Sequence, residues 1–154
     1  MKKVVITGSI ATLILAGVGY FLYLQSEPVS ASEMTVYKSP TCGCCSAWIH
    51  HLEVNGFQVN AIDMQDVTPR KIQLGITPQT ASCHTGVIDG YVIEGHVPAA
   101  DIRRLLEEKP ENIRGIAVPG MPIGSPGMEM GDRKDAYDVL AIDKDGNTSV
   151  FAKH

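Results

Sequence analysis

The stretch Ser39-Pro-Thr-Cys-Gly-Cys-Cys45 stands where a predicted strand passes into a predicted helix. The alternation in residues 34–38 is typical of a strand, and Ser39 and Pro40 end it. In residues 45–55 the apolar side chains recur at helical spacing, and Gly56 follows as a typical helix stop. The cysteines are therefore expected at the first turn of a helix.

Three cysteines, Cys42, Cys44 and Cys45, lie within four residues, and the fourth cysteine of the chain, Cys83, precedes His84. A helix N-terminus favours the thiolate form of cysteine. Thiolates are soft donors that suit Cu(I), Zn(II) or iron–sulfur clusters. Cys42 and Cys45 also form a C-x-x-C redox pair. The pattern indicates a metal site, a site of disulfide chemistry, or both.

Neighbouring residues on a helix point about 100° apart, so Cys44 and Cys45 are poorly placed to chelate one ion side by side. They are better placed to bind different ions and to bridge between them through sulfur. This favours a small copper–thiolate cluster over one tetrahedral Zn(II). Four cysteines nevertheless match a Cys₄ zinc site in number, so zinc stays open.

The N-terminal residues 1–31 are predicted to direct export. Lys2 and Lys3 precede the mainly apolar run 4–24, and a small-residue cleavage site ends at Ala31. The run is also long enough to span a bilayer, so an uncleaved membrane anchor is the alternative to a signal peptide. Either way the remainder is expected outside the cytoplasm, in the periplasm.

The charge of the chain argues against nucleic acid as a partner. It holds 13 Lys and Arg against 17 Asp and Glu, and loss of the basic N-terminus leaves the remainder more acidic.

The remaining segments predict an α/β domain. A second strand is expected over 57–64, and a short helix with Thr68 as N-cap and Pro69 as its first residue. Asp89-Gly90 between apolar runs predicts a hairpin, and a further helix is expected between Pro98 and Pro110. The order strand–helix–strand–helix–hairpin–helix is that of a thioredoxin-like domain, with the dithiol at the start of its first helix.

We therefore expect a thioredoxin-like domain over residues 32–116. Residues 117–154 are expected to form a C-terminal extension of a Gly/Pro/Met-rich loop and a second β-hairpin, with its turn at 144–147. In such a fold the stretch before the first hairpin lies against the dithiol helix, so Cys83 should face the cluster. The extension is expected to contribute to the metal site.

The chain carries further soft and imidazole donors outside the four cysteines. His84 is a candidate ligand, and the alternatives are an orienting hydrogen-bond partner or a surface residue. Thioether sulfur prefers Cu(I), so Met121, Met128 and Met130 are candidate ligands, although a methionine can also simply fill a gap in the core.

The other histidines are expected outside the site. His50 and His51 lie two turns from the cysteines and are expected on the surface. We expect His96 to serve the turn before the helix that Pro98 opens, and no feature supports a role for His154.

At these residues the chain resembles the CopG-like family of exported copper-resistance proteins, long catalogued as a domain of unknown function. The matching motifs are Ser39-Pro-Thr-Cys-Gly-Cys-Cys45, Ser82-Cys-His-Thr85, Asp89-Gly-Tyr-Val-Ile-Glu-Gly-His-Val-Pro98 and Ala117-Val-Pro-Gly-Met-Pro-Ile-Gly-Ser-Pro-Gly-Met128. The resemblance implies a thioredoxin-like domain that binds copper at Cys42, Cys44, Cys45 and Cys83. It also implies copper redox cycling during detoxification.

The leading hypothesis is a periplasmic copper-binding protein that holds Cu(I) in a thiolate-bridged cluster and interconverts Cu(I) and Cu(II). Copper ions, periplasmic copper chaperones and efflux components are its expected partners. The second hypothesis is a thiol–disulfide oxidoreductase, in which Cys42 and Cys45 are the catalytic pair. The third is a structural zinc module.

Overall fold

The computed structural model describes residues 33–154, so the predicted signal peptide or anchor lies outside the described residues. The elements in chain order are β1 (Glu33–Lys38), α2 (Gly43–Val54), β2 (Gln58–Asp63), α3 (Thr68–Gln73), β3 (Thr85–Ile88), β4 (Tyr91–Glu94), α4 (Ala99–Glu108), β5 (Ile113–Ala117), β6 (Asp138–Asp143) and β7 (Thr148–Lys153). Within these residues no helix has the length and apolar character needed to cross a bilayer.

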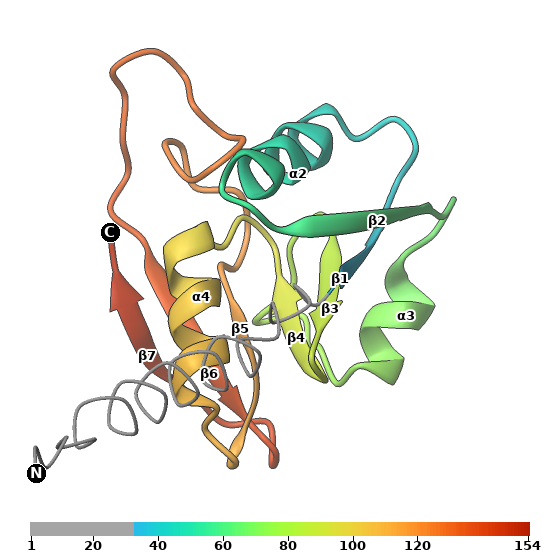
Figure 1. The fold of residues 1–154 in the computed structure, drawn as a ribbon. Coiled ribbons are helices and arrows are strands. Elements are labelled where there is room, and N and C mark those ends of the chain that lie inside the picture. Colours follow the sequence, from blue (N-terminus) through green and yellow to red (C-terminus); the bar gives the residue numbers. More distant parts are fainter. Residues whose placement is uncertain (1–32) are drawn as a thin grey trace, which may run out of the picture. The chain divides into compact units, whose positions relative to one another are not determined.

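The strands form one mixed sheet in the order β2-β1-β3-β4-β5-β6-β7 (Figure 1). β1 is parallel to β2 and β4 is parallel to β5, whereas the other neighbouring strands are antiparallel. The mixed sheet and its helices confirm the predicted α/β class. The described residues, 33–154, form one compact unit.

The predicted turn at Asp89-Gly90 is confirmed. Both residues have positive φ, 48° and 83°, which is the requirement of a type I′ turn and the reason for the Asp-Gly pair. The turn sets the register of β3 against β4, with Ile88 opposite Tyr91 and Thr85 opposite Glu94.

The cysteine helix, α2, begins at Gly43, two residues before the predicted start, with Cys42 as its N-cap. Its buried side chains are Cys45, Trp48 and Leu52. The Trp48 indole Nε1 donates a hydrogen bond to the Val97 carbonyl at 2.8 Å. This contact fixes the cysteine end of α2 to the segment that follows β4.

Helices cover both faces of the sheet. Successive residues of a strand point to opposite faces, and Ile93 and Ile116 accordingly pack in the larger core cluster with side chains of α2 and α4. Their neighbours Val92 and Ala117 pack in a second cluster that includes Ile76, just after α3. Hence α2 and α4 lie on one face and the α3 segment on the other.

Strand β5 was not predicted. Arg114 and Gly115 interrupt its apolar pattern, and that Gly is required by tertiary contact, because a Cβ at this position would lie 2.0 Å from the Val92 carbonyl oxygen. β5 pairs with both β4 and β6, so the predicted C-terminal hairpin, β6–β7, continues the main sheet.

The N-cap predicted for α3 was displaced by one residue. The helix includes Thr68, and Val67 precedes it without a side-chain cap. Instead, the Asp66 carboxylate accepts a hydrogen bond from the Thr68 amide at 2.9 Å.

Candidate metal centre

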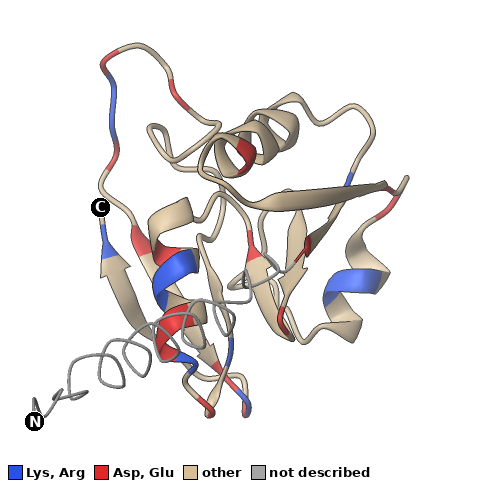
Figure 2. Cartoon of the chain, viewed as in Figure 1, with Lys and Arg blue, Asp and Glu red and all other residues tan. Residues whose placement is uncertain are grey.

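The turn between β1 and α2 presents the cysteines. The Cys42 amide donates to the Ser39 carbonyl at 3.1 Å, and the Cys42 sulfur accepts the Cys45 amide at 3.3 Å. Sulfur here takes the place of the oxygen that usually caps a helix. No charged residue lies between Lys38 and Glu53 (Figure 2). Sulfur and backbone groups therefore determine the chemistry of this end of α2.

All four cysteines are brought together. Their sulfur atoms lie within 4.8 Å of one another. Cys42 and Cys45 form a disulfide, while Cys44 and Cys83 are free thiols. The Cys44 sulfur is 3.5 Å from that of Cys42. The site thus contains a disulfide-bonded C-x-x-C pair and two further thiols within reach of the same ion or cluster.

A second group of donors shares Cys83 with the first. The Cys83 sulfur lies 3.2 Å from His84 Nδ1 and 3.1 Å from His96 Nε2. Both rings are fully buried. The His84 ring packs against Trp48, with 4.2 Å between ring centroids, and its Nε2 has no hydrogen-bond partner among residues 33–154. Cysteine and imidazole donors therefore meet at Cys83.

His96 was missed as a site residue. It does lie in the turn before α4, as expected, but its ring is directed to Cys83. The signal was available in the hairpin register. Thr85 pairs with Glu94 in the antiparallel pair. Cys83 lies two residues before Thr85 and His96 two residues after Glu94, so the same register sets them opposite each other. The Gly95 amide, between them, donates to the His84 carbonyl at 3.1 Å.

The His96 ring is held in one tautomer. Nδ1 lies 2.8 Å from the Pro126 carbonyl oxygen, which can only accept, so Nδ1 carries the proton. Nε2 then has a free lone pair facing Cys83. This is the usual arrangement of a metal-binding histidine, whose second ring nitrogen is hydrogen-bonded to an acceptor.

Burial determines the protonation of these donors. It raises the pKa of the Cys83 thiol to about 12, with a further contribution from the nearby Cys44 thiol. It lowers the pKa of His84 well below its usual value, helped by His96 and Lys71, and it lowers the pKa of His96. Both imidazoles are therefore neutral at pH 7 and able to act as donors.

Comparison with known proteins agrees with this chemistry. A solved structure titled "Copper resistance protein copG- Form 2" is 49% identical, with a TM-score of 0.77, and the match covers 81% of this chain and 99% of that one. A second, "Copper resistance protein copG- Form 1", is 51% identical, with a TM-score of 0.75 and coverage of 79% and 96%. The chain belongs to the CopG copper-resistance family.

A family model described as "Protein of unknown function, DUF411" matches residues 80–128. That segment holds Cys83, His84 and His96, and it includes Met121 and Met128 of the Gly/Pro/Met-rich loop. No protein matches among the curated sequences.

In this CopG-family chain the Gly/Pro/Met-rich loop packs directly against the cysteine helix. A Cβ on Gly127 would lie 2.7 Å from the Trp48 amide nitrogen and 2.8 Å from the Cys44 carbonyl oxygen. The Gly120 amide donates to the Ala81 carbonyl at 3.1 Å. The loop therefore contacts both chain segments that carry the cysteines.

The three methionines of the loop differ in exposure. Met121 and Met130 are 53% and 55% exposed, and Met128 is partly buried. Their role as copper ligands stays a prediction.

Two histidines outside the cluster stabilise helix ends. His51 was expected to be a surface residue, but it is half-buried, and its Nε2 accepts the Ala99 amide at 3.1 Å, which caps α4. His154, for which no role was expected, contacts the Asp101 carboxylate through Nε2 at 2.7 Å. His50 is exposed, as expected.

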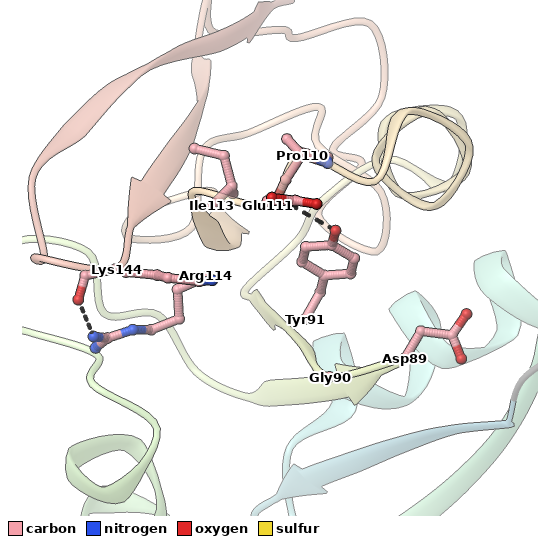
Figure 3. Close-up of a pocket in the computed structure, with 8 residues that line it drawn as sticks. All are labelled: Asp89, Gly90, Tyr91, Pro110, Glu111, Ile113, Arg114 and Lys144. Atoms are coloured by element: carbon pink, nitrogen blue, oxygen red, sulfur yellow. Dashed lines mark hydrogen bonds between the residues drawn. The ribbon is translucent and has the colours of Figure 1, made fainter.

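Among the cavities of the described residues, two are of similar size. One, of about 480 Å³, is bounded by α3 and the following loop, and Cys83 lies in its lining. The other, of about 490 Å³, lies beside the β3–β4 turn and contains no cysteine (Figure 3). Its walls carry both signs of charge, Arg114 and Lys144 with Asp89 and Glu111. Of these two cavities, only the first therefore reaches a cysteine, Cys83.

Proposed function

We propose that the protein binds copper in the periplasm, with Cys42, Cys44, Cys45 and Cys83 as its thiolate ligands. The observation that carries the proposal is the convergence of the four sulfurs within 4.8 Å. The relatives named as copper resistance proteins support the choice of metal. Adjacent Cys44 and Cys45 favour a multinuclear cluster, because a thiolate can bridge two Cu(I) ions.

The imidazoles of His84 and His96 extend this donor set. A neutral imidazole binds both oxidation states of copper, whereas thiolate and thioether favour Cu(I). The distances of both rings from the Cys83 sulfur support a mixed sulfur and nitrogen environment around that residue. Met121, Met128 and Met130 are proposed as additional soft donors that shield the site or receive copper from solvent.

We further propose that the Cys42–Cys45 pair exchanges electrons with copper. Two Cu(II) ions each accept one electron, the two thiolates form one disulfide, and two Cu(I) ions result. The reverse step oxidises two Cu(I) ions and restores the dithiolate. The disulfide in the structure supports this proposal, because Cys44 and Cys83 stay free to retain copper when that pair is oxidised.

The proposed fold assignment and location follow from the same features. The order β2-β1-β3-β4, with β1 parallel to β2, supports a thioredoxin-like arrangement for residues 32–116. Residues 117–154 would be its extension. Residues 1–31 are proposed to be a signal peptide or anchor, and copper chaperones or efflux components are proposed as partners.

Titration with Cu(I) tests the metal proposal. The fully reduced protein should bind more than one equivalent, and the protein with its Cys42–Cys45 disulfide intact should bind fewer, because it has two thiolates fewer to offer. Saturation at one equivalent in both forms would contradict a cluster. Tight Zn(II) with no copper, in protein made under copper load, would point to the zinc module instead.

A second function, thiol–disulfide exchange on protein substrates, is favoured by the disulfide at the start of α2. The variant Cys44→Ser separates the two, because it keeps the C-x-x-C pair and removes a soft donor. A disulfide oxidoreductase should keep most of its insulin-reducing activity. A copper protein should lose much of its copper and protect cells less from copper. Strong dithiol turnover by the wild type, together with undiminished copper protection by the variant, would make exchange the main function.

A further inference from the structure

A buried ion pair lies beneath the Cys83–His84 segment. Lys71 of α3 reaches across to Glu94 at the end of β4, with 2.5 Å between Nζ and Oε1. Lys71 is 8% exposed and Glu94 is fully buried. Removing two charges from water is costly, and buried pairs often add little net stability compared with apolar side chains of similar size. Stability alone is therefore a weak reason for this pair.

The Glu94 carboxylate anchors both ends of the segment that carries the thiol and imidazole. Oε1 accepts the Ser82 amide at 2.6 Å, and Oε2 accepts the Thr85 hydroxyl at 2.6 Å. The Thr85 hydroxyl in turn accepts from Lys71 Nζ at 2.9 Å. Cys83 and His84 lie between the two anchored residues.

The residues after Glu94 support the same segment. Gly95 has φ +72°, and a Cβ there would lie 2.5 Å from both the Ser82 Cβ and the Val118 carbonyl oxygen. This close approach allows the Gly95 amide to donate to the His84 carbonyl. His96 then faces the Cys83 sulfur. The end of β4 thus contacts the segment at each of its residues from 82 to 85.

We infer that Lys71 and Glu94 are positioning residues that hold Cys83 and His84 in the geometry that copper requires. The inference rests on the proposed copper site. A carboxylate is suited to the task because its two oxygens can accept from an amide and a hydroxyl at once, and the lysine ammonium offsets its charge. Hydrogen-bond partners that orient metal ligands typically change metal affinity by about 10- to 100-fold when they are removed.

Two double variants separate hydrogen bonding from charge. Lys71→Met with Glu94→Leu removes both charges and both acceptor oxygens, but keeps the volume nearly unchanged. Lys71→Met with Glu94→Gln also removes both charges, yet leaves an amide oxygen that can accept the Ser82 amide. Asp101→Asn is the matched control, because it alters another buried carboxylate, on α4, whose described partner is His154.

The Met/Leu variant should bind Cu(I) about 10- to 100-fold more weakly in competition with a chromophoric Cu(I) chelator. Its thiolate-to-copper absorption in the Cu(II) form should also shift, while urea unfolding stays cooperative. The Met/Gln variant should recover most of the affinity and the wild-type spectrum. Asp101→Asn should match the wild type in both.

Wild-type copper affinity and spectrum in the Met/Leu variant would overturn the inference. So would equal losses in the Met/Leu and Met/Gln variants, because charge and not hydrogen bonding would then be responsible. If the Met/Leu variant does not unfold cooperatively, Thr85→Val decides: it removes one anchor and should weaken copper binding several-fold, and an unchanged affinity would overturn the inference. Failure of the proposed function itself is distinct, since the wild type would then bind no copper.

Discussion

Proton competition at Cys83 gives a quantitative test of the site. Burial, with a smaller contribution from Cys44, raises the pKa of this thiol from 9.0 to about 12. Copper bound at Cys83 must displace the proton, because the thiolate is the ligand. Because this single proton competes with copper, the apparent copper affinity below pH 12 should rise about tenfold for each unit by which the pH is raised.

The contrast with an ordinary thiol lies in the alkaline range. A thiol with a pKa of 9.0 would stop contributing once the pH passes that value, whereas Cys83 should contribute up to about pH 12. We therefore expect the slope of a plot of log copper affinity against pH to be greater by one in the wild type than in Cys83→Ser. The difference should persist between about pH 7 and about pH 10.

The assay is anaerobic Cu(I) competition against a chromophoric chelator across this range. It uses protein with the Cys42–Cys45 disulfide intact, the form to which the pKa of Cys83 applies. Parallel slopes for the wild type and Cys83→Ser would refute copper binding at Cys83. A wild-type slope that flattens near pH 9 would instead refute the raised pKa.

The same shift bears on the metal-free protein. The folded state holds the Cys83 proton more tightly than the unfolded state, so the associated stability is fully present below about pH 9 and is lost as pH rises toward 12. A pKa difference of one corresponds to about 1.4 kcal/mol. The rise in pKa from 9.0 to about 12 therefore sets an upper limit of about 4 kcal/mol on the contribution of this proton to the free energy of unfolding. Water that reaches the partly exposed sulfur makes the actual contribution smaller.

Three further outcomes are expected. Gly127→Ala should lower the free energy of unfolding by about 2–4 kcal/mol in urea titrations, because the residue has φ +82° and its Cβ would crowd Trp48 and Cys44; wild-type stability would show that the loop does not pack on α2. Replacing Met121, Met128 and Met130 by Leu should weaken Cu(I) binding but change the free energy of unfolding by less than about 1.5 kcal/mol; unchanged copper binding in all three would leave the loop a packing role. His51 should make the protein sensitive to acid. Its pKa is lowered from 6.5 by burial, so the folded state prefers the neutral ring that accepts the Ala99 amide, and stability should fall as pH drops below that value. His51→Ala should cost about 1 kcal/mol in neutral solution and abolish this dependence, which unfolding measured on either side of pH 6.5 checks.

Local signals in the sequence were sufficient for several elements. The spacing of apolar residues in α2, the Asp89-Gly90 turn and the second hairpin each depend on residues near one another in the chain. A type I′ turn needs two residues with positive φ, and a helix needs one apolar face; both requirements are visible in a short window of sequence. The chemical character of the cysteine cluster was visible for the same reason.

Other features were decided by tertiary contact. Gly115 interrupts the apolar pattern of β5 because it packs against Val92, so the pattern alone did not predict a strand. His51 was judged by its distance from the cysteines along α2, while its actual partner, Ala99, lies on another helix. Long-range partners leave no period in the local sequence, which is why both were misjudged.

The sequence by itself determined which donor atoms the protein carries and that three of its cysteines begin a helix. Only the tertiary structure decided that Cys83 and His96 meet across the hairpin, and that burial keeps one as a thiol and the other as a neutral ring. The physical reason is that residue type determines which chemistry is possible. Protonation and distance depend on desolvation and on partners that strand pairing brings from elsewhere in the chain.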